Sequence, residues 1–193
     1  GWKEVGYRYS YGDGYIFLGC TKLTSITVPE GITVLPDYAF RGCSSLTSIS
    51  LPSTLTSIGS YAFSGCSGMS AISIPDSVQS MGKSAFSGCT GLAGIEIPGE
   101  VTAIADNLFY GNTGLKNVTL STKTKSIGDY AFSGCTGLTE LSLPDSIETI
   151  GGAAFYECSN LQNINIPLGW KEVGYRYSYG DGYIFLGCTK LTS

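Results

Sequence analysis

The sequence contains no histidine and few charged residues. Histidine is the commonest general base and the commonest transition-metal ligand, so most familiar catalytic and metal-binding constellations have no basis here. Charged residues make up 13% of the 193 residues, the formal net charge is −4, and lysine and arginine form no cluster. Such a mildly acidic chain argues against a sequence-independent hold on nucleic acid. We expect no enzyme, no catalytic or metal site, no cofactor and no nucleic-acid partner.

Long apolar runs are missing as well. No stretch approaches the roughly 18 apolar residues that would span a bilayer, and no charged-then-apolar leader is present. We therefore predict no membrane insertion. The first residue is not methionine, so we expect the sequence to be an excerpt of a longer protein, and the missing leader says nothing about destination. The 42% of hydrophobic residues suffice for a folded core.

A spacing of 23 residues organises the chain. Phenylalanines recur at this interval, with one longer step of 30 residues before the last of them. A unit of this length cannot bury its apolar side chains alone, so units must stack and share one elongated core. The phenylalanines are Phe17, Phe40, Phe63, Phe86, Phe109, Phe132, Phe155 and Phe185.

One unit contains two short apolar segments and a turn. Ile49 and Leu51 alternate with serine, as in a short strand, and a proline then ends the strand because it cannot donate to a sheet ladder. Leu55 and Ile58 form a second apolar pair. The segment 62–66, Ala-Phe-Ser-Gly-Cys, then turns the chain back as a single helical or three-ten turn. The pattern predicts a repeat solenoid that is mainly β.

The pattern L-x-x-I-x-[IL]-P followed by V-x-x-I-G-x-x-A-F-x-x-C resembles the BspA-like class of leucine-rich repeats, known from bacterial and protozoan surface proteins. The resemblance covers essentially every coil. It implies a right-handed leucine-rich-repeat solenoid with a parallel sheet on the concave side, short convex strands, and short turns or three-ten segments. It also implies an extracellular or cell-surface location and adhesion to host, matrix or neighbouring cells. The class is functionally diverse, so the resemblance carries fold more strongly than activity.

The cysteines are predicted to form a structural ladder. Their even spacing puts them one above another at the same corner of successive coils, where parallel Cα–Cβ directions suit a disulfide poorly. Their number is odd, and neither a C-x-x-C pair nor zinc-ligand spacing is present. Cysteine and asparagine can each donate a hydrogen bond from a small side chain to a neighbouring turn. The ladder consists of Cys20, Cys43, Cys66, Cys89, Asn112, Cys135, Cys158 and Cys188.

An identical block of 25 residues opens and closes the sequence. Residues 1–25 return letter for letter as residues 169–193, an offset of 168. We predict that 1–193 is a single solenoid of about seven coils plus a partial one, taken from a longer array with a 168-residue super-repeat. The duplication fits a recent natural event, a deliberate copy, or one sequence standing for a periodic filament. We favour a natural array or filament.

Each copy of the block carries an insertion, at residues 7–13 and 175–181, that is predicted as a β-hairpin standing out from the coil. Tyrosines alternate with arginine and serine, and Gly-Asp-Gly accepts positive φ. The tyrosines either lie down and cover the coil or leave an aromatic face exposed to a partner. The candidate ligand or self-association residues are Trp2, Tyr7, Arg8, Tyr9, Tyr11, Trp170, Tyr175, Arg176, Tyr177 and Tyr179.

The outward residues of the first strands form a second candidate surface. They are small, polar and nearly uncharged, as at Ser48, Ser50, Asn163 and Asn165. A flat hydroxyl face of this kind could lie against a glycan, although a solvated surface is the default expectation.

These observations predict a non-enzymatic cell-surface adhesion or binding module built as a repeat array. The aromatic hairpin is the expected contact with a protein or glycan on a cell or matrix surface, and its recurrence about every 34 Å would add avidity. The alternative is a structural protein of an extracellular filament, in which stacked solenoids bind further copies of themselves through tyrosine-rich lateral contacts. Enzymatic activity ranks last because no nucleophile and base can be paired.

Overall fold

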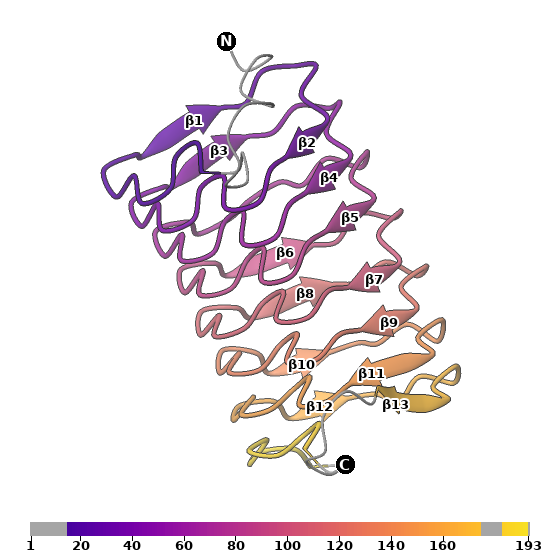
Figure 1. Cartoon of the computed structure of the whole chain (residues 1–193). Coiled ribbons are helices and arrows are strands. Elements are labelled where there is room, and N and C mark those ends of the chain that lie inside the picture. Colours follow the sequence, from indigo (N-terminus) through magenta and orange to yellow (C-terminus); the bar gives the residue numbers. More distant parts are fainter. Residues whose placement is uncertain (1–14, 175–182, 193) are drawn as a thin grey trace.

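The computed structural model describes residues 15–174 and 183–192 of the chain, which form a parallel β-solenoid without helices (Figure 1). Each coil contributes strands to two sides of the stack. The first-strand side holds β1 (Ser25–Thr27), β3 (Ser48–Ser50), β6 (Gly94–Glu96), β8 (Asn117–Thr119), β10 (Glu140–Leu141) and β12 (Asn163–Ile164). The second-strand side holds β2 (Val34–Leu35), β4 (Ser57–Ile58), β5 (Ser80–Met81), β7 (Ala103–Ile104), β9 (Ser126–Ile127), β11 (Thr149–Gly151) and β13 (Glu172–Gly174). The predicted repeat solenoid is confirmed. No helix of these residues is long and apolar enough to cross a membrane.

The register of the strand pairs repeats the 23-residue spacing of the sequence. Ser25 pairs with Ser48, and Ile127 with Ile150, always in parallel. Residues at the same phase of successive coils therefore lie side by side and form columns along the solenoid. One coil lacks a strand on the first-strand side, because residues 70–75 form no strand. Ile72 still packs against the core there, so the inward direction of its side chain is kept.

The turn that follows the second strand contains no helix or three-ten segment. The backbone N–H of Arg41 donates to the carbonyl of Tyr38, and that of Cys43 to Phe40, both at 3.0 Å. Tyr38 and Gly42 have φ values of 62° and 74°. A right-handed helical turn requires negative φ throughout, so these residues limit the segment to separate turns.

The core is a continuous column of phenylalanine rings. Neighbouring rings stack with centroids between 5.2 Å (Phe17 and Phe40) and 5.9 Å (Phe86 and Phe109). The rings from Phe40 to Phe155 are fully buried. Burial of one such side chain contributes about 1.5–3 kcal/mol, so this column is a main source of the stability of the stack.

Candidate functional site

The cysteines lie at one corner of the coils, next to the phenylalanine column. All seven are free thiols, and those from Cys43 to Cys158 are buried. Each buried thiol donates to the carbonyl of a phenylalanine one coil earlier, as from Cys66 Sγ to Phe40 O at 3.2 Å. Burial raises the pKa of Cys66 and Cys135 to about 12. These thiols stay protonated at neutral pH, and their role in the described coils is structural.

Asn112 differs from the cysteines whose place it takes. Its side chain is fully buried, and neither Oδ1 nor Nδ2 finds a hydrogen-bond partner among the described residues. The expectation that Asn112 donates to a neighbouring turn is therefore wrong. The longer amide does not reproduce the sulfur-to-carbonyl contact that the cysteines make. A buried amide without a partner lowers the stability of the fold.

Most of the residues predicted to contact a partner lie outside the described residues. This holds for both hairpin insertions, 7–13 and 175–181, and for Trp2. Trp170 is described: it is half-buried and packs against the core. Its backbone N–H donates to Pro167 O at 3.2 Å, the bond that Leu55 makes to Pro52 at 3.1 Å. Trp170 thus takes the place of a core residue and offers a partner only part of its surface.

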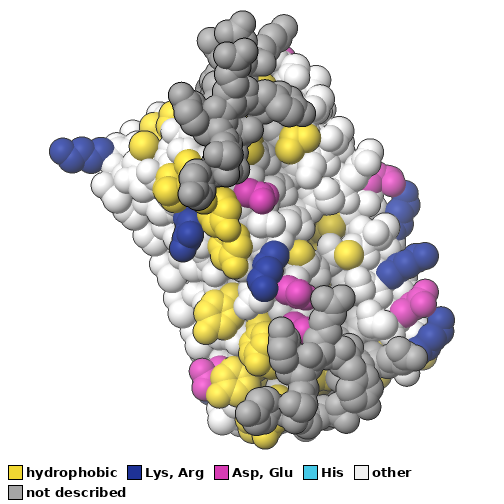
Figure 2. Space-filling view, in the orientation of Figure 1, with side chains coloured by type: hydrophobic (Ala, Val, Ile, Leu, Met, Phe, Trp, Pro, Cys, Tyr) yellow, Lys and Arg dark blue, Asp and Glu magenta, His cyan; other side chains and the backbone are white. Residues whose placement is uncertain are grey.

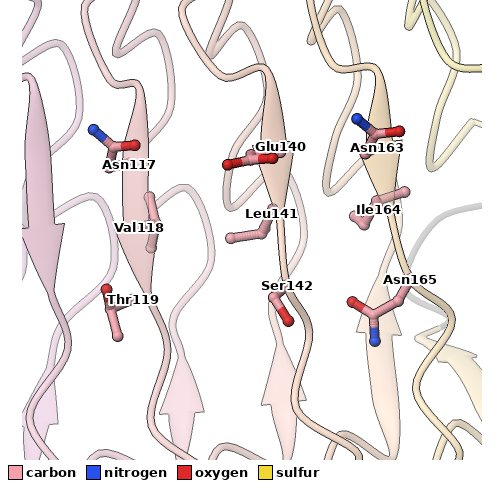
Figure 3. A pocket seen from close by; sticks show the side chains of 9 residues that line it. All are labelled: Asn117, Val118, Thr119, Glu140, Leu141, Ser142, Asn163, Ile164 and Asn165. Atoms are coloured by element: carbon pink, nitrogen blue, oxygen red, sulfur yellow. The ribbon is translucent and has the colours of Figure 1, made fainter.

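A groove of about 590 Å³ opens on the first-strand side, over β8, β10 and β12 (Figure 3). Two rows of polar side chains border it, and the inward-pointing Val118, Leu141 and Ile164 lie between the rows. The rows follow from strand geometry, because residues two apart on a strand point to the same face. One row is Asn117, Glu140 and Asn163, and the other is Thr119, Ser142 and Asn165.

Asn165 differs from the other polar residues of the two rows, because its hydrogen-bonding groups are already used. Asn165 is held by two bonds to Leu143, accepting from its N–H at 2.7 Å and donating to its carbonyl at 2.8 Å. Asn117, Glu140 and Asn163 are exposed and make no side-chain hydrogen bond within the described part of the chain. Three adjacent strands therefore present two amides and a carboxylate that are free to bind a polar ligand.

The repeats match the model of the BspA type leucine rich repeat region, in six copies over residues 13–113 and 102–193. The chain belongs to this family. Its fold resembles a leucine-rich repeat protein from Bacteroides ovatus ATCC 8483, with 32% identity and a TM-score of 0.71 over 91% of this chain and 49% of that one. It also resembles the T. pallidum leucine rich repeat protein, with 31% identity and a TM-score of 0.72 over 77% of this chain and 70% of that one.

A third similar structure is a leucine-rich repeat protein from Eubacterium ventriosum ATCC 27560, at 25% identity with a TM-score of 0.73. The match covers 88% of this chain and 44% of that protein. The chain thus spans about half the length of the Bacteroides ovatus relative. Among curated proteins, none matches the sequence.

Within this BspA-type chain, sequence reasoning found the groove face but not the groove. The outward residues of the first strands were identified as a candidate surface. The larger asparagine side chains, however, were not distinguished from small ones such as Ser48 and Ser50. Side-chain size was the available signal, because amide-bearing residues gather only on the later coils. A second set was missed altogether, namely the tyrosines that stand two residues before a core phenylalanine, such as Tyr38, Tyr61 and Tyr130.

Proposed function

We propose that this BspA-type chain is a non-enzymatic binding or adhesion module at a cell surface, and that the groove over β8, β10 and β12 contacts its ligand. The observation that carries the proposal is the row of Asn117, Glu140 and Asn163 on three neighbouring strands, whose side chains are exposed and make no hydrogen bond to any described residue. Membership of the family supports the surface location that the resemblance suggested.

The groove favours a polar ligand that is read by hydrogen bonds. Amides donate and accept, and the carboxylate of Glu140 accepts only, so the row suits the hydroxyls of a glycan or the backbone amides of a protein segment. None of the residues that line the groove is aromatic, so stacking on a sugar ring is not part of this contact. The aromatic hairpin stays a prediction for a separate contact.

The test is binding of the purified chain to a glycan array and to immobilised host-cell and matrix proteins. The double variant Asn117→Ala/Asn163→Ala removes the hydrogen bonds of two amides, each of which contributes about 0.5–1.5 kcal/mol. We expect about tenfold or greater weakening for the ligand that binds. The matched control is Ser25→Ala/Ser48→Ala, on the same side but outside the groove, which leaves affinity unchanged.

The variant Tyr175→Ser/Tyr177→Ser/Tyr179→Ser distinguishes the groove from the hairpin. If this variant loses binding while the double groove variant keeps it, the groove proposal is wrong and the hairpin is the contact site. Loss of binding only in the groove variant, with an unchanged unfolding curve, supports the groove.

A further inference from the structure

We use the name turn edge for the surface formed by the residues from three before to two after each core phenylalanine. A row of tyrosines lies on this turn edge, outside the phenylalanine column. Tyr15, Tyr38 and Tyr61 stack with centroid distances of 5.3 and 5.1 Å. The guanidinium carbon of Arg41 lies 5.6 Å from the ring centroids of both Tyr38 and Tyr61. Figure 2 shows hydrophobic side chains in a broken line down this edge, with charged groups beside them.

A second tyrosine cluster occupies the turn edge on the later coils. Tyr110 is 48% exposed and Tyr130 is 44% exposed. A hydrogen bond to the Glu157 carboxylate raises the pKa of Tyr156. Glu157 stands at a position where the other described coils have glycine, and it has a φ of 56°. A charged residue is kept there although glycine fits the backbone better.

The basic residues of the turn edge lie on the earlier coils, and all of its acidic residues except Asp37 lie on the later ones. Arg41 and Lys83 lie on the earlier coils, and Asp106 and Glu157 on the later ones. None of the four forms an ion pair within residues 15–174 and 183–192. The ion pairs that the described residues do contain, such as Lys123 with Glu100, lie elsewhere on the coils.

We propose that two copies of this chain associate antiparallel through their turn edges, with Arg41 and Lys83 of each copy facing Glu157 and Asp106 of the other. A two-fold axis between the coils of Phe86 and Phe109 produces this arrangement, because the coils pair in reverse order around it. The coil of Phe86 then faces the coil of Phe109. The coil of Arg41 lies two coils before that of Phe86, so it faces the coil of Glu157, which lies two coils after that of Phe109.

Two further carboxylates belong to the edge, Asp37 and Asp129. Asp129 faces the coil of Ser60, which carries no charge in the edge, and Asp37 shares with Arg41 the coil that faces Gly152 and Glu157. Asp37 and Asp129 accept a backbone N–H, from Ser60 at 2.6 Å and from Gly152 at 2.8 Å respectively, as Asp106 does from Asp129 at 3.0 Å. Tyr61 and Tyr130 face one another across the axis and supply contact area with a polar end.

A parallel pair does not fit these charges. If the two solenoids ran in the same direction and in register, Arg41 would face Arg41, Lys83 would face Lys83, and the acids would face acids. Like-charge juxtaposition at an interface opposes association. The excess of acidic residues on the later coils, with both basic residues on the earlier ones, therefore favours a second copy of this chain in the antiparallel direction. This contact lies apart from the groove and does not depend on it.

Sedimentation equilibrium of the 193-residue chain tests the proposal. We expect a concentration-dependent dimer that weakens as salt is added. Arg41→Glu alone and Glu157→Arg alone should each weaken association at least tenfold, because each variant creates two like-charge contacts. The double variant Arg41→Glu/Glu157→Arg should restore it. The doubly exchanged chain and the natural chain should each self-associate but should not form mixed dimers.

Lys123→Glu is the control, because Lys123 lies outside the turn edge, and it should leave dimerisation unchanged. Circular dichroism of every variant checks that the fold is kept. A chain that stays monomeric up to about 1 mM overturns the proposal. Failure of the charge exchange to restore association, or free mixing of exchanged and natural chains, overturns the antiparallel direction. Equal weakening by Lys123→Glu would show general charge repulsion and would also overturn it.

Discussion

Two aromatic columns run along this solenoid only two residues apart in each repeat. Both stack their rings, at 5.1 Å for Tyr38 and Tyr61 and at 5.2 Å for Phe63 and Phe86. The inner phenylalanine column is unbroken, whereas the outer tyrosine column stops after Tyr61, where Ser84 follows. The inner ring must fill the space inside each coil, because protein interiors are close-packed. The outer position has no such requirement and can vary from coil to coil.

The same contrast separates fold from contact elsewhere in the chain. Inner columns hold mostly apolar residues, and the polar departure at Asn112 leaves buried polar atoms without a hydrogen-bond partner among the described residues. Outer columns change residue type freely, and their departures gather groups with unused bonding capacity, as at Asn117, Glu140 and Asn163 in the groove. Variation between repeats of a single chain therefore indicates where partners can bind.

The largest difference between the two columns is expected in the free energy of unfolding when one aromatic side chain of each is truncated. Phe132 is fully buried between Phe109 and Phe155. Phe132→Ala should lower the free energy of unfolding by about 3–5 kcal/mol. Tyr130→Ser, in the same turn, should lower it by about 1 kcal/mol or less, because Tyr130 is exposed. Urea denaturation of both variants measures the difference, and equal losses would contradict the distinction between the columns.

Successive coils approach one another most closely at certain glycines, and this contact supports both columns. A Cβ on Gly128 would lie 2.6 Å from the amide nitrogen of Asp106 and 2.8 Å from the carbonyl carbon of Ala105. Gly128→Ala should therefore destabilise the fold by about 1–3 kcal/mol. Gly99→Ala is the control, because a Cβ there meets no atom within 4 Å. Thermal unfolding compares the two, and equal midpoints would refute the close approach.

Restoring the cysteine ladder should make the fold more stable. Asn112→Cys removes an unsatisfied buried amide, and the new thiol can donate to Phe86 O as Cys89 does to Phe63 O at 3.1 Å. We expect a gain of about 1–3 kcal/mol in the free energy of unfolding. The reverse change, Cys135→Asn, should cost a similar amount. Stability lost on Asn112→Cys would show that the amide has a partner after all.

The smallest change in stability is expected at Glu157, because this substitution alters only the backbone preference at one position of an outer column. Glu157→Gly should stabilise the monomer by about 1 kcal/mol, since glycine adopts positive φ without strain. Gly134→Ala, at the same position with a φ of 72° and no close contact, should cost about as much. Both are measured by denaturation at dilute concentration. A loss of stability in Glu157→Gly would mean that side-chain contacts of Glu157 outweigh the strain.

The sequence allowed the solenoid to be predicted because its determinants are local and periodic. The spacing of Phe63, Cys66 and Met69 alone places three side chains of each coil in the core. The turn was harder, since a positive φ at Tyr38 cannot be read from a tyrosine. The groove could not be located either, because its position depends on which outward residues remain unbonded. That property arises only when strands such as β8 and β10 lie side by side.

The central claim is that inner columns build the fold and outer columns make contacts. The most direct test is urea unfolding of the variant Tyr38→Ser/Tyr61→Ser/Tyr110→Ser/Tyr130→Ser. Serine already occupies the first, second and fourth of these positions in another coil at Ser84, and the position of Tyr110 at Ser133. Loss of these four rings together should cost about 2 kcal/mol, less than Phe132→Ala alone. A four-tyrosine variant that is less stable than Phe132→Ala, or that unfolds without a cooperative transition, would contradict the account.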